Sequence, residues 1–312
     1  MKKLLSLIPI YILITSCSLK SNMLMAEKAK NLEEKKIIIL DERTLFYPNK
    51  NSIPFAEISD LTYNQKDKKL YMIGDKGNFY TFNATFSNTK IETLNYLNAF
   101  KISEKKPSKK YDIEGLTHDN KGQLYVSFER YPRISKITKK GYLTSNQKLT
   151  KELKKKKNFR SSNKILEAVA WHSKYGLLTV AEYPLYKKNN TKQTIYSLKG
   201  KKWHFTAQSH KNNAITAIEV MDDNNLLILE RAYSGLTHPF VVTLKKLYLD
   251  KCDKNRNCKS EVLTSFNSYV GWAVNNYEGL AKVGKNRYLM VSDNNNKIIL
   301  TTQLIYFKVN NP

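Results

Sequence analysis

Five segments of the sequence repeat one pattern. Each has a polar residue, a small or acidic residue, an apolar strand, a turn, a second apolar strand and a closing acid. The segments are ISDLTYNQKDKKLYMIGD, IEGLTHDNKGQLYVSFER, LEAVAWHSKYGLLTVAEY, ITAIEVMDDNNLLILERA and YEGLAKVGKNRYLMVSDN. Their first polar positions lie 49 to 62 residues apart. Repeats of about 50 residues built from short strands are typical of a β-propeller, in which each repeat forms one blade.

Two further strand-like stretches follow each of the first four hairpins, but only one, KIILTTQLIYFKV, follows the last. The missing strand is available at the other end of the chain, as KIIILDERTLFY at 36–47. We therefore expect an all-β fold, a five-bladed β-propeller of four-stranded blades that 36–47 closes. Closure hides the sheet edges. A six-bladed ring is the alternative if a long connection contains a degenerate blade.

The repeat brings polar residues together at one mouth of the central channel. The first strand of each blade lines the channel and the second returns antiparallel, so the first polar residue and the closing acid lie at the same end. The inner ring comprises Ser59, Glu114, Glu167, Thr216 and Glu278. The wider ring comprises Asp75, Glu129, Glu182, Glu230 and Asp293.

Three glutamates that converge on an axis repel one another unless a cation neutralises them. Calcium suits such a ring, because it takes six to eight hard oxygen ligands in flexible geometry. No histidine or cysteine occupies the ring, which disfavours zinc. The inner ring therefore predicts a bound Ca²⁺, and the alternative is a hydrogen-bonded polar channel that holds water.

Several acidic motifs resemble those of the family described as esterase-like activity of phytase. They are DIEGLT at 112–117, FERY at 128–131, LERAYSG at 229–235, NNYEGLA at 275–281 and VSDNNN at 291–296. The resemblance covers roughly 55–306, and it implies a phytase-like propeller that hydrolyses phosphoric esters. The inner ring is also distantly similar to calcium-activated nucleotidases of the apyrase type. Those five-bladed propellers hold calcium with Ser, Glu, Glu, Ser and Glu, whereas Thr216 replaces the second serine here.

If the protein is an enzyme, Glu129 or Glu230 is the expected general base. Each is followed by an arginine, and Arg130 and Arg231 are expected to make forked contacts to phosphate. The alternative for each Glu–Arg pair is a surface salt bridge. The competing function is a non-enzymatic propeller that binds a ligand or a partner, because fold does not fix function.

Other side chains near these motifs are assigned by their place in the hairpins. Tyr131, Tyr183 and Tyr233 follow the same strand ends as the wider ring and are expected at the mouth. His118 and His172 lie within hairpins, away from that mouth, and are expected to be structural.

The chain begins MKKLLSLIPIYILITSC, with two lysines, an apolar run and small residues before a cysteine. This pattern is typical of an export signal, and the apolar run is too short to span a bilayer. Its end resembles a bacterial lipobox, which implies cleavage before Cys17 and lipid attachment to it. Because Ser18 follows, we expect an envelope lipoprotein, anchored in the outer membrane and facing the periplasm. A soluble-secretion signal is the alternative.

This interpretation divides the chain into a signal peptide at 1–16, a lipidated cysteine and polar tether at 17–35, and a propeller domain at 36–312. Cys252 and Cys258 are expected to form a disulfide, as nearby cysteines of exported proteins do. The formal charge of +26 favours an anionic partner, here a phosphorylated small molecule. An AT-rich genome would also enrich lysine. We expect a monomer and no nucleic-acid partner, because the protein is tethered to the envelope.

Overall fold

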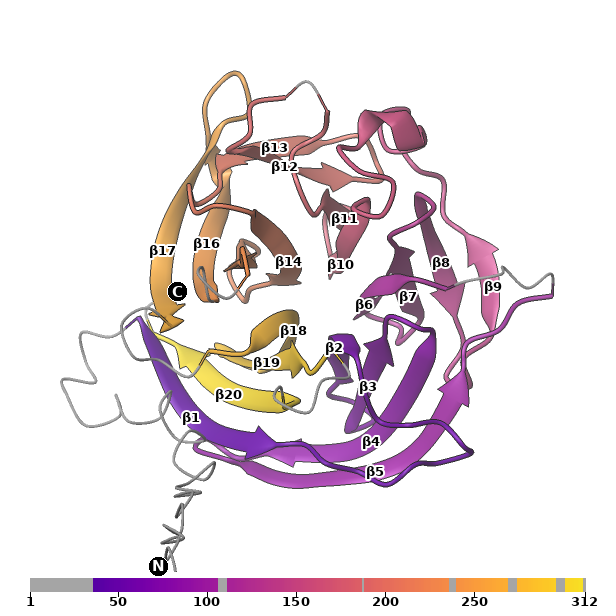
Figure 1. Ribbon diagram of the computed structural model, residues 1–312. Coiled ribbons are helices and arrows are strands. Elements are labelled where there is room, and N and C mark those ends of the chain that lie inside the picture. The colour runs from indigo at the N-terminus through magenta and orange to yellow at the C-terminus, as the bar shows by residue number, and fades with distance from the viewer. Residues whose placement is uncertain are drawn as a thin grey trace, which may run out of the picture.

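The computed structural model shows five four-stranded antiparallel sheets in a ring around a central channel (Figure 1). It describes residues 36–105, 111–186, 188–235, 240–268, 274–295 and 301–310. The predicted five-bladed β-propeller is confirmed, and the six-bladed alternative is wrong. Residues 1–35, with the predicted signal, Cys17 and the tether, lie outside the described residues.

Each blade runs from an inner strand at the channel to an outer strand at the rim (Figure 1). Blade 1 is β2 (Ile58–Asn64), β3 (Lys69–Gly74), β4 (Asn78–Phe86) and β5 (Ile91–Lys101). Blade 2 is β6 (Ile113–His118), β7 (Leu124–Phe128), β8 (Arg133–Ile137) and β9 (Leu143–Asn146). Blade 3 is β10 (Leu166–His172), β11 (Gly176–Ala181), β12 (Lys192–Ser197) and β13 (Lys202–Thr206). Blade 4 is β14 (Asn213–Val220), β15 (Leu226–Ala232), β16 (Val241–Cys252) and β17 (Cys258–Asn267). Blade 5 is β18 (Asn276–Gly284), β19 (Arg287–Asp293), β20 (Gln303–Val309) and, from the chain start, β1 (Ile37–Thr44).

Strand β1 closes the ring as predicted, because it pairs antiparallel with β20, with Ile37 opposite Val309. Ile37 and Ile39 are buried in the core between blades 4 and 5. The guanidinium of Arg43 donates to the carbonyl of Ile91 in blade 1. The first strand therefore joins the last blade and also contacts the first.

The inner strands are buried on both faces and pack closely against one another. A Cβ added to Gly115 would lie 2.8 Å from the amide nitrogen of Val169 in the next blade, and a Cβ on Gly279 would lie 2.8 Å from Cα of Asp60. Two backbones approach at these points, so only a small residue fits. This contact explains the small residue that follows the first polar position of most repeats.

The strand pairing is irregular at the same place in all five blades. In each inner strand the register shifts by one residue, which leaves one residue without a partner on the second strand. The skipped residues are Ser59, Glu114, Glu167, Thr216 and Glu278. A β-bulge redirects a side chain and is common next to functional sites. The predicted inner ring thus coincides with a bulge that recurs in every blade.

The predicted disulfide between Cys252 and Cys258 is confirmed, and it joins the ends of β16 and β17. The turn that it closes contacts the neighbouring blade, where the amide of His204 donates to the carbonyl of Arg256 at 2.7 Å. The disulfide therefore supports the outer contact between blades 3 and 4. Among the described residues, no helix has the length and apolar character needed to cross a membrane.

Candidate functional site: an acidic channel mouth

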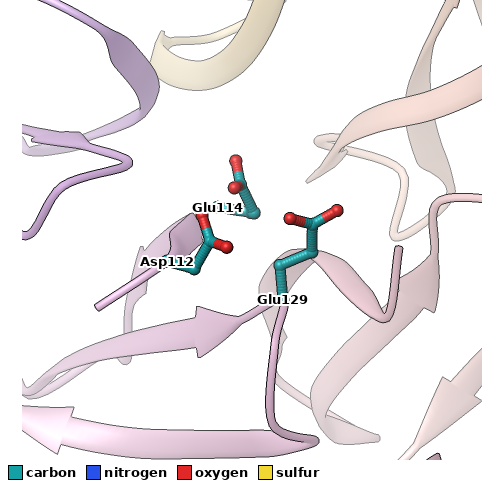
Figure 2. A group of neighbouring side chains, drawn as sticks. All are labelled: Asp112, Glu114 and Glu129. Atoms are coloured by element: carbon teal, nitrogen blue, oxygen red, sulfur yellow. The ribbon is translucent and has the colours of Figure 1, made fainter. Parts of the chain in front are cut away.

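Two groups of carboxylates converge at one channel mouth and share one member. Asp112, Glu114 and Glu129 place carboxylate oxygens within 4.8 Å of one another, and so do Glu129, Glu167 and Glu182. Figure 2 shows the first group, in which Asp112 just before β6, Glu114 on β6 and Glu129 just after β7 extend their side chains into the same space. The amide of Glu129 donates to the carbonyl of Asp112 at 2.9 Å, which fixes the two chain segments side by side. The close acids come from blades 2 and 3.

Burial and mutual repulsion disfavour the charged forms of these acids. The pKa values of Glu114 and Glu167 lie well above the ordinary value, first because of burial and then because of neighbouring carboxylates. The same causes, burial first and then repulsion from Asp112 and Glu182, raise the pKa of Glu129 to about 8. Burial and Glu278 raise the pKa of Asp293 to about 8. Such a cluster favours either bound protons or a bound cation.

The strand register changes one member of the predicted wider ring. In blade 2, Glu129 lies opposite Asp112, two residues before the bulge. In blade 4 the equivalent residue, opposite Ala214, is Arg231 and not Glu230. The wider ring is therefore Asp75, Glu129, Glu182, Arg231 and Asp293. The spacing in the sequence could have identified Arg231. It follows the bulge residue of its blade by 15 positions, as the acids of blades 2, 3 and 5 do, whereas Glu230 follows by 14.

The prediction that Glu230 acts as a general base at this mouth is not supported, because Glu230 lies in the blade interior. Its side chain is fully buried, with Nζ of Lys245 2.7 Å from Oε1. Oε2 accepts hydrogen bonds from the amide of Gln208 and from Nδ2 of Asn213, both at 2.7 Å. Successive strand residues point to opposite faces, so Arg231 faces the channel and Glu230 faces the blade interior.

Arg231 brings a positive charge to the inner ring. Its Nη2 lies 3.4 Å from Oε1 of Glu278, and Nδ2 of Asn276 donates to the same oxygen at 2.8 Å. Nε of Arg231 is buried and makes no hydrogen bond within the described residues. The neighbouring carboxylates raise the pKa of the guanidinium despite its burial. One donor of the guanidinium is thus buried without a partner among the described residues.

Ser59 and Thr216 complete the inner ring, and Asp75 represents blade 1 in the wider ring. Ser59 and Thr216 are buried, and Oγ1 of Thr216 donates to the carbonyl of Tyr277 at 3.3 Å. Asp75 is half-buried, and its Oδ1 has no hydrogen-bond partner within the described residues. The structure therefore gathers the acids of blades 2 and 3 most closely, and the ring is not fivefold symmetric.

Basic and aromatic side chains surround the acids. Arg130 pairs with Asp112, and Nζ of Lys164 lies 2.8 Å from Glu182 Oε1. The predicted mouth tyrosines are present, since the ring of Tyr183 lies 5.0 Å from Lys164 Nζ and Tyr131 is 62% exposed. Tyr233 stacks on Phe240, with ring centroids 4.5 Å apart. Both arginines contact a carboxylate, but Arg231 differs from Arg130 in that its Nε has no hydrogen-bond partner among the described residues.

Sequence reasoning missed Asp60, which lies next to Ser59 on β2. Its carboxylate accepts hydrogen bonds from the amides of Leu116 at 2.7 Å, Leu61 at 2.8 Å and Leu280 at 3.2 Å. It joins the inner strands of blades 1, 2 and 5 directly beside the bulges, and burial raises its pKa well above the ordinary value. The available signal was that Asp60 occupies the repeat position that holds glycine or alanine in the other blades.

The histidines are placed as predicted, away from the acidic mouth. Nδ1 of His118 and Oγ1 of Thr62 lie 2.9 Å apart and link blades 1 and 2. Nε2 of His172 lies 3.1 Å from the carbonyl of Asn224 and links blades 3 and 4. Both imidazoles hold inner strands together at the opposite end of the channel.

Fold and site define a five-bladed β-propeller with a carboxylate cluster at one mouth. The family model described as esterase-like activity of phytase matches residues 53–296, and the chain belongs to this phytase-like family. The comparisons do not show the apyrase-type similarity. No curated protein matches the chain.

Solved structures with a similar arrangement are distant. Virginiamycin B lyase from Staphylococcus aureus is 10% identical with a TM-score of 0.40, and the match covers 85% of this chain and 84% of that one. A protein of unknown function from Bacteroides thetaiotaomicron is 11% identical with a TM-score of 0.46, over 82% of this chain and 60% of that one. The WD40 domain of Neurospora crassa Pan2 is 9% identical with a TM-score of 0.38, over 90% and 98%. These values carry no functional argument.

Proposed function

We propose that the protein is a calcium-dependent hydrolase of phosphoric esters. Family membership supports hydrolysis, and the carboxylate cluster supports a divalent cation. The observation that carries the proposal is the position of Glu129, whose carboxylate belongs to both close groups of acids. A carboxylate in this position would contact a cation or a substrate bound between blades 2 and 3.

The residues present fit calcium. The cluster offers only hard oxygen donors, as calcium prefers. Two buried oxygens at this end of the inner strands, Asp75 Oδ1 and Asn276 Oδ1, have no hydrogen-bond partner among the described residues. The proposed ligands are Asp112, Glu114, Glu167 and Glu182, with Ser59, Thr216 and Glu278 as the rest of the inner ring. When bound, the cation would polarise a phosphoryl oxygen.

The chain's own residues supply the other parts of the reaction. We assign Arg231 to the phosphate, because its planar fork suits a phosphoryl group and one of its donors has no partner among the described residues. Glu129 takes the proton of the attacking water, whose oxygen forms a bond to phosphorus. The bond from phosphorus to the ester oxygen breaks, and that oxygen takes a proton from solvent. Asp112 is held in place by Arg130, and Glu182 by Lys164.

The test is turnover by the purified protein with and without calcium, on a panel of phosphomonoesters, phosphodiesters and nucleotides. Loss of a general base lowers kcat by about 10²–10⁴-fold, and we expect a loss in this range for Glu129→Gln. Glu92→Gln on outer strand β5 is the matched control, because its carboxylate lies on the blade rim beside Lys90. If folded, calcium-loaded protein turns over none of the esters, the propeller is a binding module and the proposal fails.

We further propose that the protein is exported and lipid-anchored through Cys17, in the outer membrane and facing the periplasm, as a monomer. The charge pattern of 1–16 and the residues before Cys17 support this location. The net charge of +26 supports an anionic, phosphorylated small-molecule substrate over a cationic one. Cys17→Ser should move the protein from the membrane fraction to the soluble fraction. A variant that stays with membranes after a salt wash would contradict lipidation.

A further inference from the structure

A cavity lies at the channel mouth opposite the acids. Its volume is about 700 Å³, and every blade contributes to its lining. One lining residue per blade is Asn64, His118, Trp171, Glu219 and Lys282. His118 lies on the same strand as Glu114, four residues further along, so the rise of a strand separates the two sites by about 13 Å. The proposed hydrolase site does not use this cavity.

The formal charges that line this cavity balance: four acids, Asp67, Asp119, Glu219 and Asp222, lie among four lysines, Lys66, Lys121, Lys139 and Lys282. Lys139 lies 2.6 Å from Asp67, and Lys282 lies 2.6 Å from Asp222. Glu219 accepts a hydrogen bond from the amide of Lys282 at 3.1 Å. Carboxylates that already have donors make a poor cation site, and the same carboxylates would repel an anion. The cavity therefore suits a neutral ligand.

Asp119, the remaining acid of the cavity, positions the stacked rings of Tyr125 and Trp171. Oδ2 of Asp119 accepts a hydrogen bond from the hydroxyl of Tyr125 at 3.2 Å. The ring of Tyr125 stacks on the indole of Trp171, with 7° between the planes and 6.3 Å between the centroids. The amide of Trp171 donates to Oγ1 of Thr117 at 3.2 Å, which fixes the backbone. The cavity thus holds a rigid aromatic surface.

Two polar groups on this wall have no hydrogen-bond partner among the residues that the structure describes. Nε1 of Trp171 is buried and makes no hydrogen bond within the described part of the chain. His118 uses Nδ1 for Thr62, and its Nε2 has no partner among the same residues. Buried indole N–H groups usually have an acceptor. A ligand that carries both hydrogen-bond acceptors and donors would satisfy His118 Nε2, and it would satisfy Trp171 Nε1 once the indole turns toward the cavity.

We propose that the mouth opposite the acids is a binding site for a neutral saccharide unit, with Trp171 as its aromatic platform and His118 as a polar contact. Sugar hydroxyls donate and accept hydrogen bonds, and the C–H face of a pyranose packs on an aromatic ring. The volume lies within the range of about 300–1,000 Å³ of small-molecule sites. This inference is independent of the proposed hydrolase activity.

The test is titration of the full protein with oligomers of glucose and of N-acetylglucosamine, followed by calorimetry and by tryptophan fluorescence. We expect saturable binding of at least one oligomer. Trp171→Phe should keep the stacking but lose the N–H donor, and so bind about 10-fold more weakly at an unchanged melting temperature. Trp171→Ala should bind more weakly still.

Two control variants test whether the saccharide binds at this mouth or elsewhere on the propeller. Trp203→Phe is the matched control, because its buried indole lies on outer strand β13, donates to the carbonyl of Leu249 on β16 of blade 4 and should not affect binding. Glu129→Gln at the acidic mouth should also leave saccharide binding unchanged. The proposal is overturned if no oligomer binds to folded wild-type protein, if Trp171→Phe binds as wild type does, or if only inorganic phosphate or a peptide binds.

Discussion

Nη2 of Arg231 lies 3.4 Å from Oε1 of Glu278, and this contact joins blade 4 to blade 5 across the acidic mouth. The pair places a cation beside a ring that is otherwise acidic. Arg231 lowers the pKa of Glu278, but burial outweighs it and leaves that pKa raised. The same guanidinium has two opposing effects, because it repels a bound cation and attracts a phosphate.

These effects predict opposite changes in Arg231→Gln. Loss of the positive charge should strengthen calcium binding, measured by calorimetry. Loss of the phosphate contact should lower kcat/KM by about 10–100-fold, since hydrogen bonds to charged groups are worth about 1.5–3 kcal/mol. Arg43→Gln, which removes an arginine from strand β1 at the rim, should change neither. Weaker calcium binding in Arg231→Gln would mean that the arginine orders the acids and does not compete with the cation.

The buried pair of Glu230 and Lys245 predicts a stability effect without a binding effect. Breaking a buried pair by removing one partner costs about 3–5 kcal/mol, because the other charge is left uncompensated. Lys245→Met should therefore lower the free energy of unfolding by this amount, and adding Glu230→Gln should restore part of it. Thermal melts measure the effect. Calcium affinity should stay at the wild-type value in the double variant, and a large fall would return Glu230 to the site.

Periodicity was sufficient to predict the blades, because the fold requires each apolar strand pair to recur and each edge to be covered. The inner-ring positions could also be predicted, since in blades 2 to 5 a polar residue stands directly before a glycine or alanine; that these positions are bulges became clear only from the strand pairing. Residue types alone could not decide which residue of blade 4 belongs to the wider ring, because both Glu230 and Arg231 follow the second strand of the hairpin and the pattern expects an acid there. Strand pairing decides between them and turns Arg231 to the channel. Asp60 was missed because its role depends on three amides from separate blades.

The raised pKa values predict how stability depends on pH without a cation. Glu129 and Asp293 titrate at about 8 in the folded protein, against 4.5 and 3.8 ordinarily. The folded state therefore binds more protons than the unfolded state between about pH 4 and 8, and stability falls as pH rises through this window. Melting temperatures in chelator should be higher at pH 5.5 than at pH 8. Saturating calcium should reduce the difference, and a melting temperature that rises with pH in chelator would contradict the cluster.

Ring closure by β1 predicts different effects for two deletions near the start of the chain. Removal of 36–44 would leave the outer edge of β20 unpaired and expose core that Ile37 and Ile39 cover. Deletion of 18–30 removes only predicted tether. The first deletion should lower the melting temperature by about 10 °C or more or prevent folding, since burying two isoleucines is worth about 3–6 kcal/mol. Equal melting temperatures for the two truncations would contradict closure.

Glu114→Gln separates a cation site from a polar channel by the sign of its effect. In chelator at pH 8, the substitution removes a carboxyl group whose charged form burial and Glu129 disfavour, so the variant should be as stable as wild type or slightly more stable. With calcium at a hundred times Kd, wild type should gain about 2.7 kcal/mol and the variant much less, so that their order reverses. Glu92→Gln should match wild type in both conditions. A variant that is less stable in chelator as well would make Glu114 a structural residue, and calcium that shifts no melting curve would remove the cation from the proposed mechanism.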